Sequence, residues 1–172
     1  MRKLKQVLLF FYLCLILGGC RCVKAKYDLK GINIPPDVSN ISIQYFRNEA
    51  SYVNPTLSQR FTEQLKDKFL RETKLAVITS EGDYRLSGAI VDYKTEPVTT
   101  STNTGALMNR FTMTVRAVFE CPKHKDMNFT ENITKFQDFE ATQSFQSIET
   151  VLSDELSKQI IQEIFNKIAL RW

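Results

Sequence analysis

Apolar and polar residues alternate in several stretches of the chain, with the two-residue period of a β-strand that buries one face. The pattern is found in residues 41–45, 74–79, 84–94 and 109–121, and less regularly in residues 134–145. In the clearest stretch, 109–121, one face would carry Phe111, Met113, Val115, Ala117 and Phe119. In the first stretch, Ile41, Ile43 and Tyr45 would share the buried face. The sequence therefore predicts five strands.

Two other stretches have the period of an amphipathic helix. In the first, an apolar residue recurs every four positions, at Leu57, Phe61, Leu65 and Phe69. Asn54 followed by Pro55 is typical of a helix N-cap and first helical residue, so we expect a helix from Pro55 to about residue 72. Ser147 is expected to cap a final helix, with Glu149 in its first turn and Lys167 in its last, as the helix dipole favours. Its apolar face would comprise Val151, Leu152, Leu156, Ile160, Ile164, Phe165 and Ile168.

The predicted order of elements is β-α-β-β-β-β-α. Each helix has a single apolar face, and burial is simplest when both helices cover one face of the sheet. We therefore predict an α+β fold, a two-layer sandwich with two helices on a small, largely antiparallel or mixed sheet. The opposite face of the sheet would be polar, with Arg85, Ser87, Arg110, Thr112, Thr114 and Arg116. Such a face is either simply solvated or a contact surface.

The first twenty residues have the layout of a secretory leader. Basic residues at positions 2, 3 and 5 precede an apolar run over 7–17, which is shorter than the roughly 20 residues that cross a bilayer. The run ends in Leu-Gly-Gly-Cys, which resembles the lipobox of bacterial lipoproteins. That resemblance implies cleavage before Cys20 and acylation of Cys20, for example with palmitate. The alternative is an ordinary secreted protein with an incidental cysteine. We thus expect a signal peptide over 1–19, a lipidated tether over 20–36 and a single domain over 37–172.

The charge of the chain is concentrated near its start. The whole sequence has a net charge of +4 and a pI near 8.9. Three positive charges belong to the leader and residues 21–30 carry an excess of three more, so residues 31–172 have a net charge of −2. A nucleic-acid-binding domain carries its positive charge on the folded body, so this class is excluded. The basic tether suits an anionic membrane surface, or it is a solvated linker.

Residues with catalytic or metal-binding potential are sparse. Cys14 would leave with the leader and Cys20 would carry lipid, which leaves Cys22 and Cys121 to pair in an oxidising compartment or to stay free. The single histidine, His124, lies in the charged turn "CPKHKD". The sequence shows no Ser-His-Asp set, glycine-rich phosphate loop or zinc-ligand spacing. We expect neither enzymatic activity nor a cofactor nor a metal.

Three stretches resemble the LptE family of lipopolysaccharide-assembly lipoproteins: "IPPDVSNISIQYFRNEASYVNPTLSQRFTEQLKDKFL", "DYRLSGAIVDY" and "IFNKIALRW". The resemblance covers nearly the whole mature chain. It implies a lipoprotein on the periplasmic side of the outer membrane, which plugs the LptD β-barrel, assists its assembly and contacts lipopolysaccharide in transit. Arg21 fits this location, because an aspartate after the lipidated cysteine is the usual signal for retention in the inner membrane.

Contact residues cannot be transferred from the family, because its basic lipopolysaccharide-binding positions match no motif here. Strand geometry alone selects Arg110 and Arg116, since guanidinium groups bind phosphates bidentately. The polar loop from Thr99 to Asn109 either inserts towards the barrel lumen or is a plain hairpin loop. Two other functions remain open: an accessory or pilot lipoprotein of a different outer-membrane complex, and a lipid-anchored enzyme, for which no nucleophile or metal constellation is present.

Overall fold

The computed structural model describes residues 31–52, 54–98 and 107–170. The predicted leader, Cys20, Arg21, Cys22 and most of the tether lie outside the described residues, as does most of the loop 99–109. None of the helices in the described part of the chain is long and apolar enough to cross a membrane.

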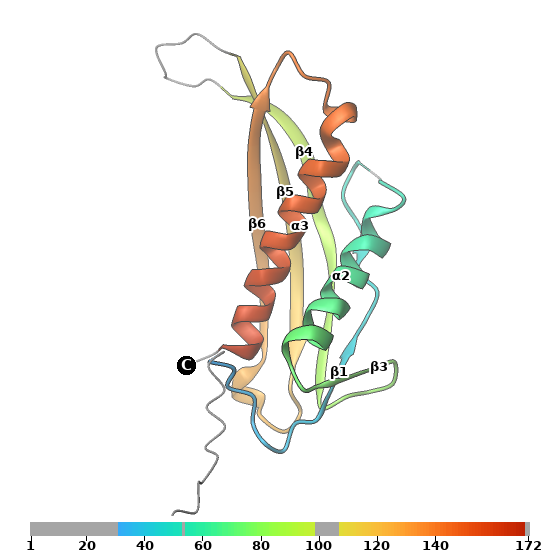
Figure 1. Ribbon diagram of the computed structural model, residues 1–172, viewed down its shortest axis with the longest axis vertical. Helices are drawn as coiled ribbons and strands as arrows, with labels where there is room; N and C mark the ends of the chain where they lie inside the picture. Colours follow the sequence, from blue (N-terminus) through green and yellow to red (C-terminus); the bar gives the residue numbers. More distant parts are fainter. Residues whose placement is uncertain (1–30, 53, 99–106, 171–172) are drawn as a thin grey trace, which may run out of the picture. The chain divides into compact units, whose positions relative to one another are not determined.

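Six strands form one mixed sheet, in the order β3-β1-β4-β5-β6, with β2 beside β4 (Figure 1). Strand β1 is parallel to both β3 and β4, β2 is parallel to β4, and β4, β5 and β6 are antiparallel neighbours. The strands are β1 (Asn40–Ile43), β2 (Arg47–Asn48), β3 (Ala76–Ile78), β4 (Tyr84–Val98), β5 (Met108–Glu120) and β6 (Phe129–Glu140). A 3-10 turn, η1 (Lys125–Met127), joins β5 to β6.

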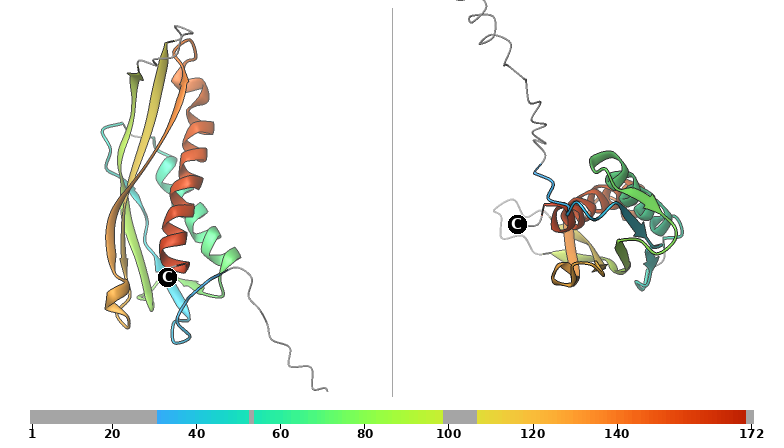
Figure 2. Two further views of the ribbon diagram at one scale, coloured as in Figure 1. Left: turned by 90° about the vertical axis from the view of Figure 1, so that its left-hand side faces the viewer. Right: turned by 90° about the horizontal axis from the view of Figure 1, so that it is seen from below.

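Both helices, α2 (Leu57–Glu72) and α3 (Phe145–Ala169), lie on the same face of this sheet (Figure 2). The predicted α+β sandwich is therefore confirmed. The predicted apolar stripe of α2 is at most 1% exposed, because residues four positions apart lie above one another on a helix. Burial of each such side chain stabilises the fold by about 1.5–3 kcal/mol. The backbone N–H of Asn33 donates to the carbonyl oxygen of Ala169 at 2.7 Å, so the described chain begins beside the end of α3.

The inward face of β5 is as predicted, with all five apolar residues at most 1% exposed. The alternation of β4 changes at a β-bulge, where Ile90 pairs with Val115 and Asp92 pairs with Thr114. Val91 is the extra residue, and it lets Ile90 and Tyr93 both face the helices, although three positions separate them. Without the bulge, strict alternation along β4 would place either Ile90 or Tyr93 on the outer face.

The prediction for Tyr45 is wrong. Strand β1 ends at Ile43, Tyr45 is 54% exposed, and Phe46 occupies the core instead. The chain leaves the sheet between β1 and β2, where the Phe46 N–H donates to Thr62 Oγ1 on α2 at 3.1 Å. The Phe46 ring packs on the backbone of Gly88, where an added Cβ would lie 2.5 Å from Phe46 Cε1. A contact with a helix and a glycine thus overrides the local alternation.

The start of the first helix also differs from the prediction. Helix α2 begins at Leu57, and Thr56 is its N-cap residue, so Asn54 and Pro55 precede the helix. The Asn54 side chain still organises this segment, because its Oδ1 accepts hydrogen bonds from the backbone N–H and the hydroxyl of Thr56, both at 3.1 Å. Asn54 therefore forms a local turn rather than a cap.

The last strand begins and ends about five residues before its predicted positions. The sequence predicts the strand over 134–145, whereas β6 starts at Phe129 and ends at Glu140. The final helix starts at Phe145 rather than after Ser147, with Ser144 at the N-cap position. Ser147 lies within the first turn and its hydroxyl donates to the Ser144 carbonyl oxygen at 2.6 Å. Aromatic packing explains the early start, because the Phe145 ring lies 5.1 Å from that of Phe111.

The buried face of α3 differs from the prediction at its N-terminal end. Val151 is 68% exposed, whereas Ser153 and Ser157 are at most 2% exposed. Positions three and four apart share a helix face, so Ser153, Leu156, Ser157 and Ile160 form one buried stripe that excludes Val151. The buried serine hydroxyls find hydrogen-bond acceptors close by. Ser153 Oγ, for example, donates to the carbonyl oxygen of Thr150 at 3.1 Å.

Candidate contact surfaces

Arg110, one of the two predicted contact residues, lies on the outer face of β5 and is already paired. Its Nε lies 2.7 Å from Asp138 Oδ1 and its Nη2 lies 2.9 Å from Asp138 Oδ2. The guanidinium carbon also lies 3.9 Å from the centroid of the Phe136 ring. This hydrogen-bonded pair lowers the pKa of Asp138 and raises that of Arg110. Any anion that binds Arg110 bidentately must therefore replace the Asp138 carboxylate.

Arg116, the second predicted residue, is paired with Glu49, whose Oε2 lies 2.9 Å from its Nη2. The two arginines are six residues apart on one strand, about 20 Å at roughly 3.4 Å per residue. They therefore cannot clamp a single phosphate together. Lys94 on the same face lies within 3.6 Å of Asp92 and 3.1 Å of Glu96. The outer face is thus a polar surface with balanced charges, rather than the basic surface that the arginines alone indicate.

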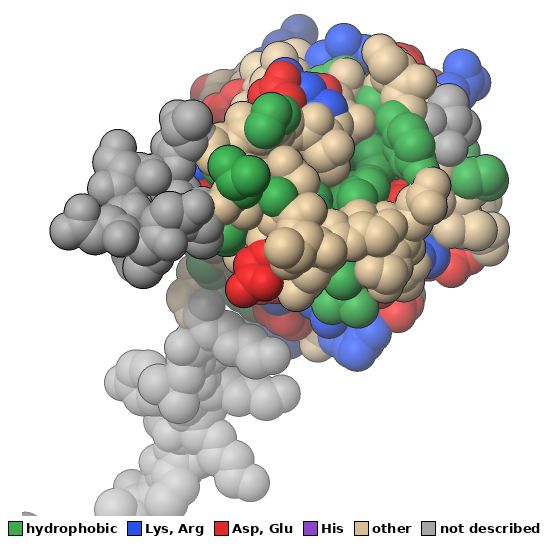
Figure 3. Space-filling model, turned by 90° about the horizontal axis from the view of Figure 1, so that it is seen from above, with side chains coloured by type: hydrophobic (Ala, Val, Ile, Leu, Met, Phe, Trp, Pro, Cys, Tyr) green, Lys and Arg blue, Asp and Glu red, His purple; other side chains and the backbone are tan. Residues whose placement is uncertain are grey.

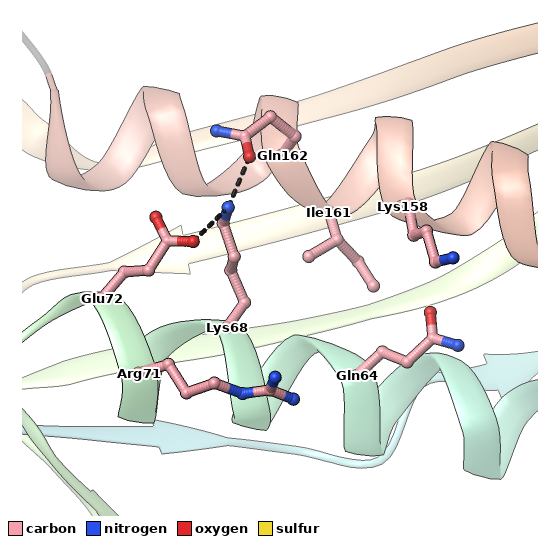
Figure 4. A pocket seen from close by; sticks show the side chains of 7 residues that line it. All are labelled: Gln64, Lys68, Arg71, Glu72, Lys158, Ile161 and Gln162. Carbon is pink, nitrogen blue, oxygen red and sulfur yellow. Dashed lines mark hydrogen bonds and ion pairs between the residues drawn. The ribbon is translucent and has the colours of Figure 1, made fainter.

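A cleft with a volume of about 310 Å³ lies between α2 and α3 (Figure 4). Lys68 crosses it and donates to Glu72 of its own helix and to Gln162 of α3. The buried Oε1 of Gln64 accepts no hydrogen bond within the described residues. The full lining is Gln64, Lys68, Arg71, Glu72, Lys158, Ile161 and Gln162. A second, shallower hollow of about 490 Å³ lies on the β6 side of α3 and shares Lys158 and Gln162 with the first. Sequence reasoning missed both hollows, because each exists only once α3 is packed.

A carboxylate organises the end of the domain that carries the β4–β5 connection. Glu149 Oε1 accepts the Tyr93 hydroxyl at 2.8 Å and the Asn54 Nδ2 at 2.7 Å, and its Oε2 accepts the Tyr52 hydroxyl at 3.4 Å. Burial, together with Glu149, raises the pKa of Tyr93. The sequence assigned Glu149 to the helix dipole, but the structure makes it the link between three segments. Apolar side chains are also exposed at this end (Figure 3). Leu107, which directly precedes β5, is 76% exposed.

A polar cluster ties the β5–β6 turn to the segment before β1. Asp83 accepts the backbone N–H of Ser39 at 3.0 Å and lies 2.7 Å from Lys123 Nζ, and these hydrogen bonds lower the pKa of Asp83 to about 2. The His124 Nε2 lies 3.0 Å from Asp37, so this histidine is engaged in the turn where the sequence places it.

The cysteine that follows β5 is buried. Cys121 is a free thiol with no exposed surface, and its backbone N–H donates to Asn128 Oδ1 at 2.7 Å. Its candidate partner Cys22 lies outside the described residues. No group of three or more His, Cys, Asp and Glu side chains that could hold a metal ion occurs in the described part of the chain.

The fold and these surfaces define the class: a small two-layer α+β domain with a paired-charge outer face and two polar hollows beside α3. A family model described as lipopolysaccharide-assembly, LptE, matches residues 38–168, from just before β1 almost to the end of α3. The chain belongs to the LptE family of lipopolysaccharide-assembly proteins. This result confirms the resemblance seen in the sequence, and membership implies an outer-membrane lipoprotein of a non-enzymatic family.

Comparison with solved structures finds similar chains at low sequence identity. The hypothetical protein CT253 from Chlamydia trachomatis is 10% identical, with a TM-score of 0.54 over 76% of this chain and 98% of that chain. A minor lipoprotein from Acinetobacter baumannii is 13% identical, with a TM-score of 0.43 over 73% of this chain and 96% of that chain. Lipoprotein GNA1162 from Neisseria meningitidis is 9% identical, with a TM-score of 0.40 over 72% of this chain and 99% of that chain. No curated protein matches this sequence.

Proposed function

We propose that this protein is the lipoprotein subunit of the lipopolysaccharide translocon, seated in an LptD-like β-barrel on the periplasmic side of the outer membrane. The observation that carries the proposal is the family match, which covers all the described helices and strands except the last residue of α3. The leader sequence adds the membrane anchor: cleavage before Cys20 leaves this residue as the acylated amino terminus. Lipidation of a single cysteine with two or more chains suffices for stable anchoring.

The outer face of the sheet is suited to the interior of a large barrel, which is polar. Its hydroxyl-bearing side chains include Thr114 and Thr134, which hydrogen-bond to each other across β5 and β6 at 2.9 Å. Its arginines and lysine are paired with carboxylates on the same surface. A surface with balanced charge can sit against a polar wall without leaving an uncompensated ion. The protein would thus plug the barrel and support its assembly.

In contact with lipopolysaccharide, a phosphate of the lipid would replace the carboxylate that is now paired with each arginine. The Asp138 carboxylate forms a bidentate pair with the Arg110 guanidinium. A phosphate of lipid A or the inner core can form the same two parallel hydrogen bonds with a guanidinium group. Arg116 and Glu49 offer a second such pair further along β5. The spacing of about 20 Å means that the two pairs would contact different parts of the transported molecule.

The test is to extract the tagged full-length protein from membranes in mild detergent and to identify what copurifies. A large β-barrel of the LptD type in near-equal amount supports the proposal, and depletion of the protein should then trap lipopolysaccharide below the outer leaflet. Enrichment of a different outer-membrane assembly instead assigns an accessory or pilot role.

A second experiment addresses the arginines within that complex. A photo-crosslinking residue at position 110 or 116 should capture lipopolysaccharide, whereas the same residue at Arg85 serves as the matched control. Arg85 is also an outer-face arginine paired with a carboxylate, Glu81, but it lies at the start of β4 opposite Glu120, beyond both Arg110 and Arg116 along β5. Equal capture from all three positions would contradict the assignment of Arg110 and Arg116.

A further inference from the structure

The two edges of the sheet are unequal. At one edge β3 has 3 residues, whereas β6 at the other edge has 12. No helix or strand of the described residues lies beyond β6 (Figure 1). The backbone hydrogen bonds of the described residues pair β6 with β5, and none joins its free edge to another element. Short strands cover the opposite side, which is a common protection against unwanted pairing, although they pair with β4 only as far as Ile90. Strand β6, by contrast, presents a row of backbone donors and acceptors along its whole length.

Strand β6 is also regular along its whole length. It pairs with β5 in unbroken register, from Met108 opposite Glu140 to Phe119 opposite Phe129. It contains no proline and no glycine, and no bulge interrupts its pairing, in contrast to the bulge that bends β4. Natural edge strands are usually blunted by one of these features.

The charged side chains of β6 do not guard its edge either. Lys135 lies 2.7 Å from Glu163 of α3, and Glu131 lies 2.6 Å from Lys167 of α3, so both point to the helix layer. Asp138 is held by Arg110 of β5. A lysine that extends over the free edge is the usual deterrent to strand addition, and here the one lysine of the strand is held elsewhere. The exposed residues of its outer face are Thr130, Asn132, Thr134, Phe136 and Glu140. Glu140, at the end of the strand, accepts the Thr142 hydroxyl at 3.3 Å.

We propose that the open edge of β6 pairs with a β-strand of the partner barrel, adding the protein's sheet to an edge of the barrel before that barrel closes. The inference rests on the proposed function and supplies its physical means, because an incomplete barrel also has an unpaired strand edge that membrane lipid cannot satisfy. The lengths agree: a membrane-spanning β-strand has roughly 9–11 residues, and β6 has 12. Small hydroxyl side chains at Thr130 and Thr134 leave room for a neighbouring strand.

The experiment compares two pairs of substitutions in the full-length protein. The edge pair is Thr130→Lys with Thr134→Lys, both on the outer face of β6. The control pair is Ser87→Lys with Thr112→Lys, which adds the same charge to the same face on the interior strands β4 and β5. The outer face is proposed to meet the barrel wall, so both pairs should lower the amount of copurified barrel. We expect the edge pair to lower it at least fivefold more than the control pair. Loss of similar size from both pairs, or from neither, would overturn the edge proposal.

A backbone measurement on the unmodified protein complements the variants. Hydrogen exchange of the amides of residues 129–140 should slow at least tenfold in the complex captured while the barrel is still incomplete, relative to the free protein, while exchange over 76–78 on the opposite edge stays unchanged. Unchanged exchange over 129–140 in that assembly complex overturns the proposal. So does full protection of β6 without the barrel, because a second copy or residues 1–30 would then occupy the edge. If the unmodified protein brings down no barrel, the proposed function itself fails, a result distinct from the others.

Discussion

The link that Glu149 makes between three segments allows a quantitative test of the structure. Replacement of Glu149 by alanine removes the acceptor of the Tyr93 hydroxyl, and Tyr93 is only 2% exposed. A buried donor left without an acceptor costs about 1–3 kcal/mol. Asn54 also loses its 2.7 Å bond to the carboxylate but can turn to water. We therefore expect Glu149→Ala to lower the free energy of unfolding by about 2–3 kcal/mol.

A double-mutant cycle separates this interaction from nonspecific damage. Tyr93→Phe removes the donor and leaves the ring, so on that background Glu149→Ala should cost only about 1 kcal/mol. The coupling free energy between Tyr93 and Glu149 is then about 1–2 kcal/mol. Glu149→Gln keeps an acceptor oxygen and should be the mildest of the three substitutions. Urea unfolding followed by circular dichroism gives all four free energies with a common denaturant slope. A coupling below about 0.3 kcal/mol would refute the hydrogen bond as the source of the effect.

Three further predictions concern other parts of the chain. Gly88→Ala places a Cβ 2.1 Å from the backbone oxygen of residue 116, so it should destabilise the fold by about 3 kcal/mol or more, whereas Ser87→Ala should change stability by less than about 0.5 kcal/mol in the same urea assay. Cys20→Ser should abolish incorporation of labelled palmitate, and retained label would contradict the assignment of the lipid site. The folded-state pKa of Asp83 is about 2, below the usual 3.8, so its contribution to stability is present above about pH 4 and is lost as the pH falls towards 2. Asp83→Asn should therefore flatten the loss of stability between pH 4 and 2, and an unchanged pH profile would argue against the Asp83–Lys123 pair.

The regular parts of the fold were predictable because their signals are local. Four apolar residues at intervals of four fix the buried stripe of α2, and five alternating residues fix the inward face of β5. The errors fall where a distant contact overrides the local pattern. Phe46 replaces Tyr45 in the core because α2 and Gly88 accept its ring, and Val91 forms a bulge that the alternation of β4 does not reveal.

The candidate surfaces also depend on contacts between residues that are distant in the sequence. The sequence identified Arg110 and Arg116 and their common strand face, but it presented them as free positive charges. Their partners are 28 and 67 positions away, so only the paired sheet and the returning loop bring the carboxylates to them. Glu149 was likewise assigned to a helix terminus, although its partners lie 56 and 95 positions away, at Tyr93 and Asn54.

The sequence by itself determined the class of fold, the resemblance to the LptE family and the approximate position of the two helices and the main strands. These properties follow from periodic burial and from motifs that neighbouring residues define. Only the tertiary structure decided which charges are neutralised, where the hollows beside α3 lie, and that the 12-residue β6 is an edge strand along its whole length. The reason is physical: charge pairing, cavity formation and edge exposure depend on residues that meet across long separations, which the order of residues along the chain does not encode locally.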